Sequence, residues 1–207
     1  MIPTSAPTAA WRAALVRAAL PLALATACLL AASLGEAGRN ALRYEREALT
    51  ELELWRVLTA HLVHLGPAHL ALNLLGLVAV WALGATELRG RPGWLAAGCS
   101  ALVVSAGLLI AEPAVAWYVG LSGVLHGLLA ASAWRAGGWF GATLGIGLVL
   151  KLVLEALHGG PATTEALIGA PVVVAAHLYG AVGGSLAALL ERGCAGAPGI
   201  MRRRQSP

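Results

Sequence analysis

The sequence contains no aspartate, one lysine and one phenylalanine, and only 12% of its 207 residues are charged. Hydrophobic residues make up 58%, which excludes an ordinary soluble domain and is typical of a polytopic membrane protein. Without aspartate, a Ser-His-Asp triad is impossible, and only a glutamate can supply a third member. The net charge is +4, but the arginines are not clustered, so we expect no nucleic-acid partner.

Cysteine is also scarce. Cys28 and Cys99 fall inside apolar runs and Cys194 lies near the end of the sequence. No two of them pair plausibly, so we expect no disulfide. We also expect no cofactor and no bound metal.

Six hydrophobic runs follow one another along the chain, and all but the fourth approach the ~20 residues that a membrane-spanning helix needs. We therefore predict an all-α polytopic membrane protein with six transmembrane helices. The first run is long and further runs follow it, so we expect a span and not a cleavable signal. Residues 1–192 form the membrane domain, and 193–207 form a basic cytoplasmic tail that we expect to be disordered. The runs are roughly 14–34, 67–84, 94–111, 122–134, 139–157 and 172–190.

The arginines are divided unequally between the two ends of these predicted helices. Arg39, Arg43, Arg46 and Arg56 fall in the loop 35–60, and the other nine fall on the opposite side. The excess of arginine predicts that both termini are cytoplasmic and that this loop is outside. Because the loop mixes charges with leucines and a tryptophan, we expect short amphipathic helices at the outer membrane face, anchored by Arg56.

Ser122 lies in Gly120-Leu-Ser-Gly123, at the beginning of the fourth hydrophobic run. A polar side chain inside a membrane segment is a functional hypothesis by default, but a serine hydroxyl needs a neighbouring base to act as a nucleophile. Ser122 precedes Arg135 by 13 residues, which places it ~20 Å above the cytoplasmic boundary and ~10 Å below the outer surface. Residues 112–120 must then enter the membrane as non-helical backbone.

His177 and Asn73 are predicted at the same depth as Ser122. Each precedes an acidic residue at the cytoplasmic end of its helix by 14 residues, or ~21 Å. Gly180 and Gly184 share a helical face with His177, and Gly123 and Gly127 form a second small-residue stripe. Such stripes allow membrane helices to approach closely, as a serine–histidine hydrogen bond requires. The alternative is plain helix packing with an incidental histidine.

Other polar residues have two interpretations each. His69 and Asn73 lie one turn apart and could donate to an oxyanion, or they could simply bond between helices. His126, one turn below Ser122, could stack on His177, bond to it, or fill a gap. Lys151 and Glu155 are either a charge pair facing the cavity or a contact for a polar substrate group.

His61, His64 and His69 together suggest a metal site, but no His-Glu-x-x-His motif and no paired acidic ligand accompanies them. We therefore expect structural roles for His61 and His64, with hydrogen bonds tying the outer loop to the second span.

Taken in order, these motifs resemble the rhomboid intramembrane serine proteases. The resemblance covers about residues 55–190 and implies a Ser122–His177 dyad, an oxyanion hole from His69, Asn73 and the Ser122 N–H, and cleavage of a transmembrane substrate near the outer face. The motifs are Trp55-Arg56, His64-x4-His69-x3-Asn73, Gly120-Leu-Ser-Gly123 and Ala176-His177-x2-Gly180-x3-Gly184.

His126 departs from common rhomboids, which carry an aromatic residue there. The stretch Gly-Leu-Ser-Gly-Val-Leu-His-Gly, residues 120–127, is more similar to that of rhombosortases. This resemblance implies a multi-pass protein of the bacterial inner membrane. Its substrates would be secreted proteins with a C-terminal Gly-Gly motif, a hydrophobic helix and a basic tail.

Two other classes remain to be compared. A rhomboid-like pseudoprotease would bind membrane segments without cutting them, and the presence of both Ser122 and His177 argues against it. A transporter or channel would need polar groups across the membrane, but here they cluster at one outer level and no internal repeat is visible.

Overall fold

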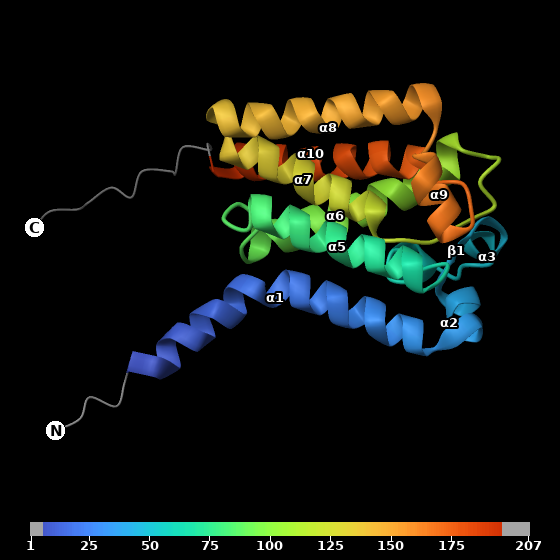
Figure 1. The fold of residues 1–207 in the computed structure, drawn as a ribbon, viewed down its shortest axis with the longest axis horizontal. Helices are drawn as coiled ribbons and strands as arrows, with labels where there is room; N and C mark the ends of the chain where they lie inside the picture. The colour runs from blue at the N-terminus through green and yellow to red at the C-terminus, as the bar shows by residue number, and fades with distance from the viewer. Residues whose placement is uncertain (1–5, 196–207) are drawn as a thin grey trace, which may run out of the picture.

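The computed structural model describes residues 6–195, with side chains for residues 18–192, so residues 196–207 of the predicted tail lie outside the described part. Six long helices lie side by side in one bundle (Figure 1). They match the six hydrophobic runs of the sequence in order. They are α1 (Ala6–Ser33), α5 (Pro67–Gly84), α6 (Arg91–Ala111), α7 (Ser122–Ala136), α8 (Gly138–His158) and α10 (Val174–Ala195).

Not all six are long and apolar enough to cross a membrane. Within the described residues, α5, α6, α8 and residues 174–192 of α10 meet that criterion, and the end of α1 meets it together with α2 (Gly35–Leu42), from which it is bent by 119°. The protein is therefore a multi-pass helical membrane protein with four or five candidate spans, and the predicted six are not confirmed. Helix α7 fails because its 15 residues reach only ~22 Å.

Helix α7 is the central helix of the bundle. It packs against α5, α6, α8 and α10, and nine of its 15 residues are buried. The chain reaches it without a helix over residues 112–121, as predicted from the depth of Ser122. This approach includes β2 (Trp117–Tyr118), which pairs antiparallel with β1 (Tyr44–Glu45). The strand pairing was not predicted, and it satisfies backbone groups of a non-helical segment, which protein within a membrane must pair internally.

The loop 35–60 folds into three short helices, α2, α3 (Arg46–Thr50) and α4 (Arg56–Thr59), as expected. The Arg56 guanidinium is buried and donates to the carbonyls of Asn40 at 2.7 Å and Arg43 at 2.9 Å, while pairing with Glu53. The predicted anchoring role of Arg56 within this loop is confirmed.

The described chain begins and ends at the same end of the bundle, and α2, α3, β1 and α9 (Ala162–Ile168) lie at the opposite end (Figure 1). Between the two ends, large apolar side chains face outward with more than 60% of their surface exposed. Such a surface suits contact with lipid and not with water. Examples are Leu75, Val78, Ile110, Ile146 and Leu157.

Candidate active site

A cavity of about 680 Å³ opens between α5, α7, α8, α9 and α10, next to strand β2. Its walls are mostly apolar, and one group of polar side chains lies among them. Most of the polar residues that the sequence singled out are brought together here, whereas Arg56, His61 and His64 are not part of the lining. The polar lining residues include His69, Asn73, Ser122, His126, Lys151, Glu155 and His177.

Ser122 and His177 lie within hydrogen-bond distance of each other. The Oγ of Ser122, the first residue of α7, is 2.9 Å from the Nε2 of His177 on α10. The His177 side chain is buried. The two residues are 55 positions apart in the sequence, and the structure brings them together as their matching depths predicted.

Close packing of α7 on α10 makes this contact possible. A Cβ at Gly180 would overlap the carbonyl oxygen of Gly123, and a Cβ at Gly184 would overlap that of Gly127. The two predicted glycine stripes therefore meet backbone to backbone, and any larger residue would push the helices apart.

Glu155 on α8 contacts the other nitrogen of the His177 ring. Its Oε2 accepts a hydrogen bond from Nδ1 at 2.8 Å, and its Oε1 pairs with Lys151. Because a carboxylate can only accept, the proton of the neutral ring is on Nδ1 and Nε2 is free to accept from the Ser122 hydroxyl.

The sequence interpretation missed the contact between Glu155 and His177, although a signal for it existed. Glu155 is a rare acidic residue inside a hydrophobic run. It lies 17 residues after Gly138, or ~25 Å from the end where α8 begins. That depth is within about one turn of Ser122.

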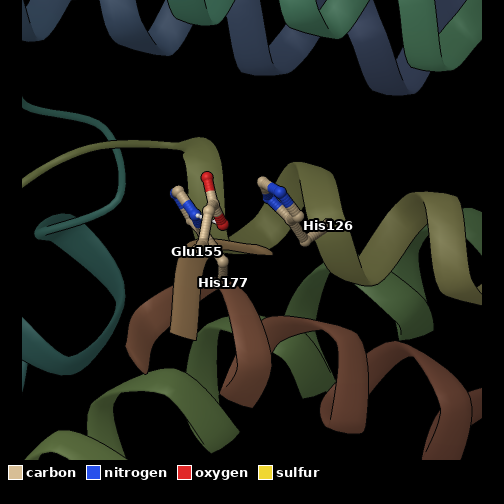
Figure 2. A group of neighbouring side chains, drawn as sticks. All are labelled: His126, Glu155 and His177. Carbon is tan, nitrogen blue, oxygen red and sulfur yellow. Dashed lines mark hydrogen bonds and ion pairs between the residues drawn. The ribbon is translucent and has the colours of Figure 1, made fainter. Parts of the chain in front are cut away.

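His126 stacks on His177. The ring centroids are 4.1 Å apart and the planes differ by 13°, while the Nδ1 of His126 donates to the carbonyl of Ser122 at 2.8 Å. Figure 2 shows His126 on one side of His177 and Glu155 close to both. Of the predicted options for His126, stacking is the one that the geometry supports.

Possible donors for a developing negative charge line the same cavity as the serine. The Nδ1 of His69 accepts from the Leu65 N–H at 3.4 Å, so the neutral ring carries its proton on Nε2. That edge of the ring faces Gly120, where φ is +123° and an added Cβ would lie 2.9 Å from Nε2. Gly120 is thus required both by its conformation and by the space that His69 takes.

Asn73 and the beginning of α7 supply further donors. The Asn73 Nδ2 donates to the carbonyl of His69 at 3.0 Å, which uses one of its two hydrogens. The N–H of Ser122 lies in the first turn of α7, where backbone donors have no partner within the helix.

His61 and His64 do not line this cavity. His61 donates from Nε2 to the carbonyl of Ala101 on α6 at 3.1 Å, and burial lowers its pKa to about 4. His64 is buried against the edge of His69, with ring centroids 5.0 Å apart, and burial likewise lowers its pKa to about 4. His61 therefore ties the outer loop to α6, and neither ring nitrogen of His64 has a hydrogen-bond partner in the described part of the chain. The predicted hydrogen bonds from these two histidines to the second span, α5, are not found among the described residues, and only their burial fits a structural role.

Three possible metal ligands, His126, Glu155 and His177, place donor atoms within 4.8 Å of one another (Figure 2). Both ring nitrogens of His177 are already bonded, to Ser122 and to Glu155. The lone pair of an imidazole nitrogen lies in the plane of its ring. Because the rings of His126 and His177 are stacked, their lone pairs lie in parallel planes and do not point at one common ion. The cluster therefore fits a hydrogen-bonded site better than a metal centre.

A serine hydroxyl that donates to a buried imidazole, with N–H donors lining the same cavity, is what serine-based acyl transfer requires. A Rhomboid domain model matches residues 51–193, from the residue after α3 through most of α10. The chain belongs to the rhomboid family, whose members are generally intramembrane serine proteases. No curated protein matches the chain.

Proposed function

We propose that the protein is an intramembrane serine endopeptidase in which Ser122 and His177 form the catalytic dyad. The observation that carries this proposal is the 2.9 Å contact between the Ser122 Oγ and the His177 Nε2 at a cavity among membrane helices. Membership of the rhomboid family supports the same activity.

The mechanism follows from the positions of the protons. The Nε2 of His177 accepts the hydroxyl proton as the Ser122 Oγ attacks the peptide carbonyl carbon, and it then returns that proton to the leaving amine. A water molecule releases the acyl group by the same route in reverse. The Ser122 N–H, the His69 Nε2–H and the second Asn73 N–H stabilise the oxyanion.

The substrate would be a protein anchored by a transmembrane helix. Aliphatic residues of α5 and α7 line the cavity beside the polar group, which suits an apolar segment that enters from the bilayer. The first and last described residues lie at one end of the bundle (Figure 1). The excess of arginine at this end favours a cytoplasmic location for it. In this orientation Ser122 lies toward the outer face. The proposal counts α1, α7 and the four candidate spans as six crossings, with both termini in the cytoplasm.

The rhombosortase-like stretch around Ser122 narrows the substrate class. On that basis the enzyme acts in a bacterial inner membrane on secreted proteins that end in Gly-Gly, a hydrophobic helix and a basic tail. The support is His126, whose ring stacks on His177 where common rhomboids have an aromatic residue.

A pseudoprotease is the alternative function, but the hydrogen-bonded Ser122–His177 pair does not favour it. Co-expression with reporters tests the proposal. One reporter carries the Gly-Gly, helix and arginine tail, and a second has both glycines replaced by valine. We expect cleavage of the first only, and none with Ser122→Ala. If the Ser122→Ala variant cleaves the first reporter as well as the wild type does, the proposed protease activity is contradicted. If the wild type cleaves both reporters equally, only the rhombosortase-like specificity is contradicted.

A further inference from the structure

We propose that Glu155 is a positioning residue that completes a Ser122–His177–Glu155 triad, with Lys151 holding the second carboxylate oxygen. This inference rests on the proposed protease function and adds a third member to its dyad. Neither composition nor family membership requires such a residue, and the chain has no aspartate to provide it.

The geometry of Glu155 matches the third position of a triad. Its Oε2 is 2.8 Å from the His177 Nδ1, on the opposite side of the ring from the Ser122 contact. Both side chains are buried, at 6% and 7% exposure. A carboxylate there fixes the tautomer in which Nε2 accepts the serine proton, and it stabilises the imidazolium that forms without itself becoming protonated.

Lys151 explains how a carboxylate remains charged in this setting. Lys151 and Glu155 are separated by one helical turn on α8, and the ammonium group pairs with Oε1. An isolated buried carboxylate would instead become neutral. If Glu155 served only as a charge partner of Lys151, its second carboxylate oxygen would need no partner on another helix. Here that oxygen bonds to His177 on α10.

Because Lys151 pairs with one side of the residue at position 155, it fixes which way an amide placed there would face. In Glu155→Gln, the amide oxygen must face Lys151, because an ammonium group only donates. The amide nitrogen then faces the His177 Nδ1 and donates to it. This moves the ring proton to Nε2, where it blocks transfer from Ser122.

Labelling with a fluorophosphonate probe tests this inference without a known substrate. We expect Glu155→Gln to lower the labelling rate at saturating probe by about 10²–10⁴, by analogy with the third residue of other triads. The half-saturating probe concentration and the thermal midpoint of unfolding should not change. Glu165→Gln is the matched control. The Glu165 carboxylate, on α9, also accepts a hydrogen bond, but from the Val172 N–H and not from His177. This variant should be labelled at the wild-type rate.

The double variant Lys151→Met/Glu155→Gln provides a test that a structural role would not pass. Without the lysine, the amide can rotate and present its oxygen to Nδ1, so this variant should label faster than Glu155→Gln but slower than Lys151→Met. A wild-type rate in Glu155→Gln, or a double variant no faster than the single one, overturns the proposal. If Glu155→Gln does not fold, the comparison is between Lys151→Met and the double variant. Equal labelling rates in these two variants overturn the proposal. Absence of labelling in the wild type, or equal labelling in Ser122→Ala, would instead contradict the protease function.

Discussion

The rings of His126 and His177 are stacked with centroids 4.1 Å apart, and no hydrogen bond joins the two rings in the described part of the chain. Each nitrogen of His177 has another partner, Ser122 or Glu155. His126 therefore contacts His177, the proposed general base, through the face of its ring and helps to hold it in place. The sequence left open a bond from His126 to His177, but the His177 Nδ1 bonds to Glu155, which therefore sets the tautomer of His177.

Replacement of His126 distinguishes stacking from hydrogen bonding. His126→Phe keeps a flat ring against His177, so we expect it to retain most of the wild-type labelling rate. His126→Ala should lose up to about tenfold, since an aromatic pair contributes about 0.5–1.5 kcal/mol. The measurement is fluorophosphonate labelling at matched protein concentration. If both variants are equally impaired, the bond from His126 to the Ser122 carbonyl is the important contact.

Asn73→Ala removes one proposed oxyanion donor. Loss of one such donor typically costs about 10²–10³ in kcat, and His69 and the Ser122 N–H remain to sustain some activity. Reporter cleavage under single-turnover conditions measures this effect. Leu75→Ala, on the outward face of the same helix, is the control. Wild-type cleavage by Asn73→Ala would mean that Asn73 only bonds within the bundle.

Gly180→Ala should separate α7 from α10. The added methyl group overlaps the Gly123 carbonyl, and overpacking of this kind costs about 1–3 kcal/mol. We expect a lower thermal midpoint and a large loss of labelling, because Ser122 and His177 move apart. Gly147→Ala on α8 is the matched control, since nothing lies within 4 Å of its added methyl group. An unchanged midpoint in Gly180→Ala would show that the helices are less closely packed.

Acid should destabilise the fold through His61. Burial lowers the pKa of His61 from 6.5 to about 4, so between these values the unfolded chain binds a proton that the native protein does not. The free energy of unfolding therefore falls as pH falls from 6.5, by on the order of 2–3 kcal/mol near pH 4.5.

His61→Gln tests this pH dependence in detergent micelles. The variant removes the titrating group, so its thermal midpoint should fall less between pH 6.5 and 4.5 than that of the wild type. His158→Gln, which replaces an exposed histidine, is the control. The same decline in His61→Gln and wild type would assign the acid sensitivity to other groups.

Much of the fold and site was predictable because membrane depth is a simple quantity. Hydrophobic runs define the long helices, and a constant rise per residue places Ser122, His177 and Asn73 at one level. Glycine spacing then indicates which faces meet, and the contact between Gly180 and Gly123 confirms it. These predictions needed only local sequence.

The remaining features depend on contacts that no local pattern specifies. The pairing of Tyr44 with Tyr118 joins two segments 74 residues apart, each only two residues long. The rotation of α8 about its axis decides whether Glu155 faces His177 or lipid, and the sequence interpretation considered only the pair with Lys151 and a contact with substrate.

The central claim is that Ser122 is a nucleophile activated by His177, and the site of a fluorophosphonate adduct tests it most directly. Mass spectrometry of the labelled wild-type protein should locate the adduct on Ser122. The adduct should be absent from Ser122→Ala and reduced to background in His177→Ala, with both variants folded. An adduct on another residue, or undiminished labelling of Ser122 in His177→Ala, would contradict the account.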